Sequence, residues 1–564
     1  MKRIIAFLLI AVACAAVGWR AFEVAAPPTE PLSKFVPAGP MLYLEARDFS
    51  TLLGDWNRSP EKQAWLASTS YEVFSRSRLF LRLRGASDQF AVAAGLPPDM
   101  KILTEVAGDR SALALYDIGK LQFLYITHLP SAKAMQTSLW QTRAKFEPRT
   151  VGSNTFFIRR DPESEREVAF AVSGDYLLLA TREDLLAGAL QLMNGAQNRT
   201  VESEFWWTQA TTSAPQVGDL RMVLNLSKIV PDGYFRTYWL QQNITDLSQY
   251  SAAVSDLFRG ANEFREERVL VRKAEANSFP SPDDQAAASE VARLVPSDFG
   301  TYQSIASPSG DSCFELLRSK LLDPHLSAAP PSESAPPQVQ LTSGEVGGPD
   351  LETRIDQPPV QHAAEDKKSA LESLLQENKL RAALFVQSTA RDNGSVFVRF
   401  HSAVVLVSDS AWNESELDSA LAAYVRPNIT ASELGVSWQN GSAYHQFDGL
   451  WPLVTAIRGN YWFVSDDPEM LATMLAKFEI KPDRHPGVFI GEFSHQRERA
   501  NFARFSQIVD RPSATANAES SEPQFFSGTI ASLSSSLLSA ANESITVRVD
   551  KDNVRQTVTY RWSH

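Results

Sequence analysis

The chain has 564 residues, 44% hydrophobic and 21% charged, which is typical of a globular protein of several domains and excludes wholesale disorder. Its 54 basic and 66 acidic residues give a net charge of −12, which argues against nucleic acid as a partner because that partner needs a basic surface. Two cysteines, Cys14 and Cys313, are too few for a disulfide framework or a cysteine-based zinc site.

Residues 1–26 have the features of a signal peptide or signal anchor. Lys2 and Arg3 precede an apolar run of sixteen residues from Ile4 to Trp19. In a helix this run reaches about 24 Å, less than the roughly 30 Å of a hydrocarbon core, which favours a cleaved export signal. An uncleaved anchor and a lipoprotein acylated at Cys14 are the alternatives. We therefore expect an exported protein of the bacterial envelope, periplasmic or anchored to the inner membrane, with membrane contact through this segment if it is uncleaved.

Two distant segments of the chain resemble each other. Residues 168–190 and 453–475 align without a gap at an offset of 285, with six identities in 23 positions. Both combine a strand, a Gly-Asp or Gly-Asn turn, a second strand and an acidic start to an amphipathic helix. The motifs Phe35-Val36-Pro37 and Leu294-Val295-Pro296 each precede a strand, at an offset of 259. This repetition predicts an internal duplication, with two unrelated domains as the alternative.

The two predicted copies span residues 35–273 and 292–562. The offset between the copies grows from 259 at the Pro37/Pro296 pair to 285 at residues 168–190, which requires an insertion in the second copy. The Pro-rich stretch 324–364 predicts a disordered loop there because it has no apolar periodicity. Another loop is expected at 512–523. The corresponding part of the first copy has helical spacing from Phe80 to Ala94 instead, ended by the glycine that follows.

Short hairpin strands that alternate with single helices predict an α+β fold. Each copy should contain a mainly antiparallel sheet with helices packed on one face. The run 121–126 is apolar on both faces, which indicates a largely covered sheet. Near the end of the first copy, a helix ending at Ala261-Asn262 is expected before a strand at 268–272.

No specific catalytic signature is present: the sequence lacks a Walker A loop and the GxGxxG, HExxH, GxSxG and CxxC motifs. We therefore assign no catalytic, cofactor-binding or metal-binding residues and expect no cofactor. The eight histidines lack ligand spacing, and His401 and His445 are interpreted as surface or core side chains of predicted strands.

Four other patterns have a structural and a functional interpretation. Cys313 is interpreted as a half-buried residue of a helix capped by Asp311 or Ser312, and the alternative is a catalytic nucleophile. The acidic runs 161–165 and 466–469 are interpreted as a hairpin tip and a helix N-terminus, and the alternative is that they bind calcium. The tryptophans are interpreted as core residues, and the alternative is that they line a groove for an apolar ligand or a polymer. Within this set, Phe205-Trp206-Trp207 is the best surface candidate, since three consecutive aromatic residues cannot all face one core.

The segment Pro40–Glu45 after Phe35-Val36-Pro37, and the strand of Gly174–Ala180 that leads into a helix, carry a resemblance. They look like a family of exported bacterial proteins known only as a domain of unknown function. The resemblance implies an exported α+β protein and supplies no catalytic residues.

Three functions follow from these observations. The first is a non-enzymatic binding or scaffolding protein of the envelope, which a solid core and an exposed aromatic patch near Trp206 would favour. The second is a carrier or sensor of an apolar envelope ligand, which an apolar cavity would favour. The third is an exported hydrolase without a recognisable motif, which a polar pocket with a carboxylate, a serine and a histidine would favour.

Overall fold

A computed structural model describes most of the chain. The described residues are 30–67, 69–76, 78–234, 247–273, 282–322, 369–390, 399–429, 438–440, 443–447, 452–481, 487–499, 501, 540–550 and 552–562. The predicted signal or anchor at 1–26 and the predicted loops at 324–364 and 512–523 lie outside them. In the described part of the chain, no helix is long and apolar enough to cross a membrane.

The chain divides into two compact units, each of helices and antiparallel strands, so the α+β class is confirmed. The first unit comprises Met1–Leu66, Tyr71–Phe258 and Glu267–Ala276. The second unit comprises Ala67–Ser70, Arg259–Glu266 and Asn277–His564.

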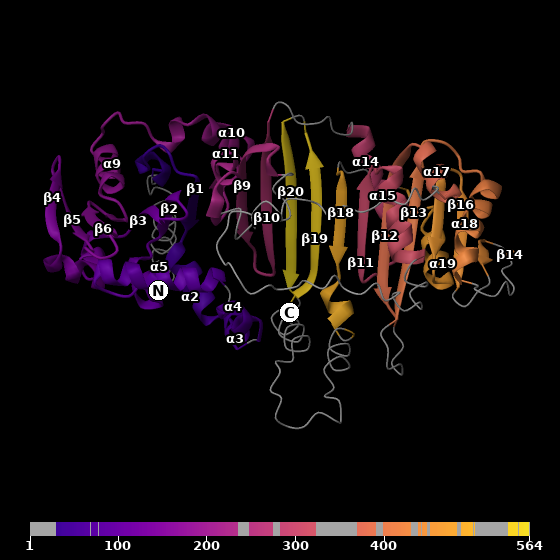
Figure 1. Cartoon of the computed structure of the whole chain (residues 1–564), viewed down its shortest axis with the longest axis horizontal. Helices are drawn as coiled ribbons and strands as arrows, with labels where there is room; N and C mark the ends of the chain where they lie inside the picture. Colours follow the sequence, from indigo (N-terminus) through magenta and orange to yellow (C-terminus); the bar gives the residue numbers. More distant parts are fainter. Residues whose placement is uncertain are drawn as a thin grey trace, which may run out of the picture. The chain divides into compact units, whose positions relative to one another are not determined.

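The strands of the first unit lie in the order β9-β8-β1-β2-β3-β7-β6-β5-β4, and every neighbouring pair is antiparallel (Figure 1). β10 (Glu263–Arg272) follows β9 at the other end. The strand bounds are β1 Leu42–Arg47, β2 Arg110–Asp117, β3 Gln122–His128, β4 Glu147–Val151, β5 Asn154–Arg160, β6 Glu167–Ser173, β7 Tyr176–Ala180, β8 Leu220–Leu224 and β9 Tyr250–Arg259.

The strands of the second unit lie in the order β20-β19-β18-β11-β12-β13-β17-β16-β15-β14, again with antiparallel neighbours. Numbered from the first strand of each unit, this order is the same as in the first unit. The bounds are β11 Thr301–Ala306, β12 Leu380–Thr389, β13 Phe400–Ser408, β14 Trp438–Asn440, β15 His445–Phe447, β16 Leu453–Arg458, β17 Tyr461–Ser465, β18 Phe489–Phe493, β19 Ala540–Val549 and β20 Asn553–Trp562.

Helices connect these strands. Those of the first unit include α2 Phe49–Arg58, α3 Pro60–Leu66, α5 Arg78–Ala94, α6 Met100–Val106, α7 Ser131–Ala134, α8 Ser138–Gln141, α9 Glu183–Met193, α10 Phe205–Ser213 and α11 Leu226–Ile229, and α4 Thr69–Ser75 begins in residues assigned to the second unit. Those of the second unit include α14 Pro282–Ala292, α15 Gly310–Leu317, α17 Ala370–Glu377, α18 Glu414–Ile429 and α19 Pro468–Ala476.

Helices cover both faces of the sheet in the first unit, not one face as expected. Because side chains alternate along a strand, Ala169 and Ala171 of β6 pack in the cluster of α9, which includes Leu186. Val168 and Phe170 of the same strand pack in the opposite cluster with Ala94 of α5. The apolar residues on both faces of these strands therefore each have a helical cover.

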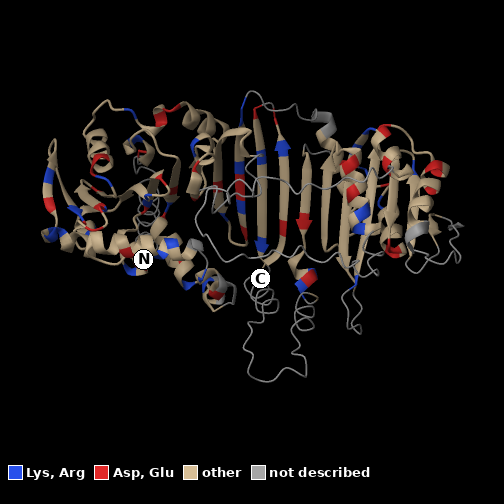
Figure 2. Ribbon diagram, in the orientation of Figure 1, with Lys and Arg blue, Asp and Glu red and all other residues tan. Residues whose placement is uncertain are grey.

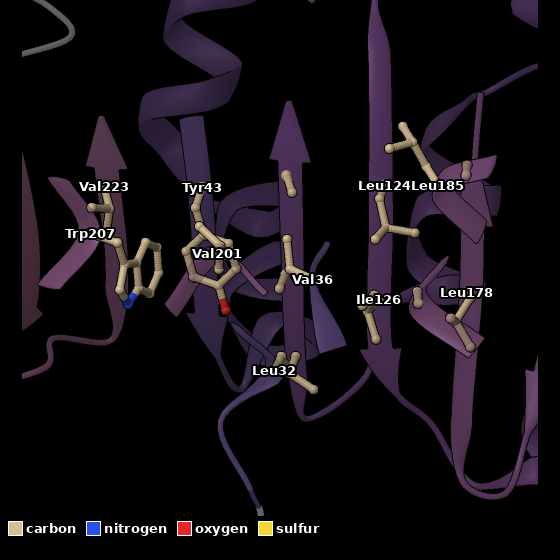
Figure 3. Close-up of a cluster of buried hydrophobic side chains, with 14 of the residues drawn as sticks. Leu32, Val36, Tyr43, Leu124, Ile126, Leu178, Leu185, Val201, Trp207 and Val223 are labelled. Atoms are coloured by element: carbon tan, nitrogen blue, oxygen red, sulfur yellow. The ribbon is translucent and has the colours of Figure 1, made fainter. Parts of the chain in front are cut away.

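The core on the α9 face is closely packed (Figure 3). Tyr43 of β1 is 1% exposed and meets the ring of Trp207 of α10 edge to face, with centroids 5.0 Å apart. Its hydroxyl donates a hydrogen bond of 2.6 Å to Glu45, so the buried polar atom is satisfied.

Several local predictions are confirmed. The spacing from Phe80 to Ala94 forms α5, and Gly95 follows it with φ +72°, a conformation that glycine adopts without a steric penalty. Gly174 and Gly459 also have positive φ, in the β6–β7 and β16–β17 hairpins.

The predicted helix ending at Ala261-Asn262 is wrong, because residues 250–259 form strand β9. The run has enough apolar residues for either structure, and pairing with β8 decides it. Asp256 of β9 is 2% exposed and accepts two hydrogen bonds of 2.8 Å from Arg221 of β8, which fixes the register of the two strands.

Candidate functional site

The first unit contains an apolar cavity of about 430 Å³. Its floor is the face of the sheet opposite α9, formed by alternate residues of β1, β2, β3 and β7. Its cover is formed by α5, α6 and the segment between them. Most of the lining side chains are aliphatic or aromatic: Leu44, Ala46, Phe49, Leu83, Ala86, Phe90, Leu96, Pro98, Ile102, Leu103, Val106, Leu113, Leu121, Phe123, Tyr125, Leu139, Val168, Leu179 and Leu220.

The polar atoms at the floor of the cavity already have partners. The hydroxyl of Tyr125 lies 2.9 Å from the carbonyl oxygen of Val106 and 3.0 Å from the hydroxyl of Ser111. The hydroxyls of Ser111 and Thr127 are 2.7 Å apart, and the amide of Gly108 donates to Thr127 over 3.0 Å. Burial raises the pKa of Tyr125, which keeps its phenol neutral and a hydrogen-bond donor.

A second group of polar residues, Arg166, Glu167 and Thr181, lines another part of the wall and is also engaged. The Thr181 hydroxyl accepts from the amide of Phe123 over 2.9 Å and lies 3.0 Å from the carbonyl of Leu121. Glu167 accepts from the amide of Glu183 over 3.1 Å. The cavity wall therefore offers apolar surface rather than unsatisfied polar groups, which suits a ligand without many hydrogen-bonding atoms.

The cavity reaches the surface between α5 and α6. Leu83 of α5 and Leu103 of α6 both line it, and they are 50% and 39% exposed. An apolar molecule therefore meets exposed leucines before it meets the interior.

A polar pocket in the second unit gathers Glu414, Asp418 and His445. The Nδ1 atom of His445 on β15 lies 2.9 Å from a carboxylate oxygen of Asp418, and its Nε2 atom lies 3.4 Å from one of Glu414. The two acids are four residues apart on α18, which places them on the same face of the helix. This cluster was not predicted from the sequence, although the acidic pair of Glu414 and Asp418, four residues apart, was a visible signal for one half of it.

The cluster in this pocket does not form a nucleophilic triad. Two serines line the pocket, but the hydroxyl of Ser419 donates to the carbonyl of Ser415 within the helix, at 2.7 Å. Both ring nitrogens of His445 face carboxylates, so neither is directed at a serine as a general base requires. Three donor atoms lie within 4.8 Å of one another and could hold a metal ion, yet a histidine ring placed between two carboxylates accounts for the same geometry.

The other singled-out residues have structural roles. Cys313 is 1% exposed within α15, and burial raises the pKa of its thiol to about 12, so it is more buried than expected and unsuited to nucleophilic attack. The cap of this helix is Ser309, not Asp311 or Ser312. In the acidic runs, Asp161 accepts hydrogen bonds from Ser164 in a hairpin loop, and Asp467 caps α19. His401, the other strand histidine, lies 3.8 Å from Asp467.

The three consecutive aromatic residues at the start of α10 face different ways. Trp207 is buried against Tyr43, Trp206 packs partly against the same core, and Phe205 is 77% exposed. A single exposed ring therefore remains of the expected aromatic patch.

No family model matches the chain, and no curated protein matches it. Among solved structures, crystal forms III and I of TP0453 are similar at 12% identity and a TM-score of 0.24; each covers 45% of this chain, and 84% and 82% of TP0453 respectively. Crystal form IV gives 13% identity, a TM-score of 0.23 and coverage of 43% and 81%. We draw no conclusion about fold or function from a likeness this low.

Proposed function

We propose that this is an exported envelope protein that carries or senses an apolar ligand, and that the ligand binds in the cavity of the first unit. The observation that carries the proposal is the combination of about 430 Å³ of space, a wall of aliphatic and aromatic side chains, and an opening at Leu83 and Leu103. Small-molecule sites have volumes of roughly 300–1,000 Å³, and an apolar cavity of about 150 Å³ is enough to bind benzene. The export itself is inferred from residues 1–26.

We also propose that the two units are copies of one duplicated module. The identical strand order supports this, and so does the register of the paired residues. Leu44, Leu113, Tyr125 and Leu179 are successive partners across β1, β2, β3 and β7. Gln303, Phe385, Val404 and Val464 are partners across β11, β12, β13 and β17. The outer members of these two rows are offset by 259 and 285 residues, the values already found in the sequence.

Partner binding or scaffolding is a second candidate function, favoured by the exposed ring of Phe205. An isolated exposed aromatic side chain is common on soluble proteins, and the cavity is the stronger observation. The two candidates are compatible, since a carrier also needs a partner that receives its ligand.

Binding of the fluorescent apolar amine N-phenylnaphthylamine to the purified full chain tests the proposal. We expect its emission to rise on binding, and Ala86→Trp, which places an indole into the cavity from α5, to weaken binding at least about tenfold, the equivalent of roughly 1.4 kcal/mol. Ala423→Trp is the matched control, because Ala423 is an exposed alanine of helix α18 in the second unit.

Equal binding by the Ala86→Trp and Ala423→Trp proteins would exclude the cavity as the binding site. Near-ultraviolet circular dichroism of each variant shows that a loss of binding does not reflect a loss of tertiary structure.

A further inference from the structure

The wall of the cavity contains a positive charge that no acidic side chain of the described residues balances. Arg166 lines the cavity, is half-buried, and forms no ion pair within the described part of the chain. Most of the wall is aliphatic or aromatic, and a charge in such surroundings is costly unless an opposite charge accompanies it. A ligand that enters the cavity with a negative charge would supply that partner.

Two hydrogen bonds fix the guanidinium of Arg166 in the wall. Its Nε atom donates to the side-chain oxygen of Gln89 on α5 over 3.1 Å, and its Nη1 atom donates to the carbonyl oxygen of Lys120 in the β2–β3 turn. Both acceptors are neutral, so they orient the guanidinium without compensating its charge. The Nη2 atom has no hydrogen-bond partner among the described residues and is available to a ligand. A carboxylate bound here would therefore meet a donor group whose position is already set.

The acidic side chain of the wall is already balanced. Glu167 forms an ion pair with Arg160 and accepts a hydrogen bond from the amide of Glu183 over 3.1 Å. Strands β3 and β7, which form part of the floor, contain no Lys, Arg, Asp or Glu, as Figure 2 shows. The wall thus has one positive charge to neutralise, which matches a monoanion better than a phosphate dianion.

We propose that the ligand of the cavity is an amphipathic carboxylic acid, bound as its anion, with its headgroup on Arg166 and its apolar tail along the rest of the wall. The inference rests on the function proposed above and narrows it from any apolar molecule to one that carries a single carboxylate. A carboxylate accepts strong hydrogen bonds from a guanidinium, and their attraction is greater in surroundings of low dielectric constant than in water. Phe90, Phe123 and Leu179 line the same cavity and offer apolar surface to the tail.

Displacement of N-phenylnaphthylamine by octanoate and by 1-octanol tests the headgroup, because the two competitors have chains of the same length. We expect Arg166→Gln to weaken the binding of octanoate at least about tenfold and to leave that of 1-octanol nearly unchanged, since only the acid loses a charged partner. Arg159→Gln is the matched control, because Arg159 is also half-buried in the first unit but does not line the cavity. An equal change for both competitors would overturn the inference.

A second comparison needs no variant. Octylammonium has a chain of the same length and the opposite charge, so the unaltered full chain should bind octanoate at least about tenfold more tightly than octylammonium. The net charge of −12 favours the ammonium ion at any nonspecific site, so a preference for octanoate reports the local charge of the cavity. Equal displacement by the two ions, or better displacement by octylammonium, would overturn the inference even if Arg166→Gln failed to fold.

Failure of this inference and failure of the carrier function can be told apart, because N-phenylnaphthylamine has no acidic group. We expect the Arg166→Gln protein to bind this probe as tightly as the unaltered chain does. Probe binding that Ala86→Trp weakens, without a preference for octanoate, would overturn the inference alone. Absence of saturable probe binding to the unaltered chain would overturn the proposed function, and this inference with it.

Discussion

The same position of the sheet is filled in one unit and left open in the other. Phe385 of β12 occupies the place that Leu113 has on β2, and Trp462 of β17 occupies the place of Leu177 on β7. Trp462 is fully buried, and its indole N–H donates to the hydroxyl of Thr455 over 2.8 Å. Leu113 lines the cavity of the first unit, whereas Phe385 is 5% exposed in a core cluster of the second unit, so the same position faces open space in one unit and packed side chains in the other.

The covering helices differ in the same sense. In the second unit, Leu317, Leu375 and Leu421 come from α15, α17 and α18, and each is fully buried in one cluster. In the first unit, α5 and α6 keep Leu83 and Leu103 partly exposed at the opening of the cavity. A shared strand order thus sets the floor of a binding site, and the covering helices decide whether there is room for a ligand.

The largest expected effect comes from opening the second unit. Trp462→Ala removes a fully buried indole and leaves Thr455 without its donor, so we expect the free energy of unfolding to fall by about 3–5 kcal/mol. Urea denaturation monitored by circular dichroism measures it. A loss below about 1 kcal/mol would mean that the indole of Trp462 is not closely packed in the core of the second unit.

The reactivity of the Cys313 thiol measures how closely the second unit is packed around α15. Burial raises the pKa of its thiol from 9.0 to about 12, so the thiolate fraction near neutral pH should be about a thousandfold lower than in the unfolded chain. Alkylation by iodoacetamide, followed by peptide mass spectrometry, should be slow until urea unfolds the protein. Because folding favours the protonated thiol, its stabilising contribution is complete below pH 9 and is lost between pH 9 and 12. Rapid alkylation of the native protein would contradict close packing around α15.

Two adjacent leucines of β7 lie on opposite faces of the sheet in the first unit, one in the packed core and the other in the wall of the cavity. Leu178 is fully buried against the α9 core, and Leu179 lines the cavity. We expect Leu178→Ala to cost about 2–5 kcal/mol and Leu179→Ala about 1–2 kcal/mol, because a side chain beside an empty space has fewer contacts to lose. The difference between their urea midpoints is the measurement. Equal losses would mean that the cavity is occupied by protein side chains in solution.

The smallest effect is expected when the first unit receives the residue of the second. Leu113→Phe adds volume at the floor of the cavity, and filling such a space stabilises proteins by about 0.5–2 kcal/mol. N-phenylnaphthylamine should bind this variant less tightly. A destabilised protein with unchanged probe binding would show that Leu113 has no free space beside it.

Local features of the fold could be predicted from short segments. Helical spacing and Gly95 predicted α5, and the Gly174 and Gly459 turns predicted two hairpins. β9 was mistaken for a helix because its apolar run satisfies either periodicity and only its neighbours on the sheet decide between them. The pairing of Asp256 with Arg221 is one such neighbour effect.

The candidate sites could not be located in the same way. The cavity joins Leu83 of α5 to Leu179 of β7, and His445 meets Asp418 across two elements, so both sites depend on residues far apart in the sequence. The helical spacing that places Leu83 and Phe90 on one face of α5 was the visible signal of the cavity cover.

The sequence by itself determined the alternation of apolar residues, the turns, the acidic charge and the repeated offsets of 259 and 285, because each depends on residue identity and spacing alone. Only the tertiary structure decided that one face of the sheet borders a cavity in the first unit, whereas the described residues on the same face of the second unit are packed in a core cluster. The volume left in a core is the difference between the space that the elements enclose and the side chains that enter it, and that difference exists only once distant elements have packed together.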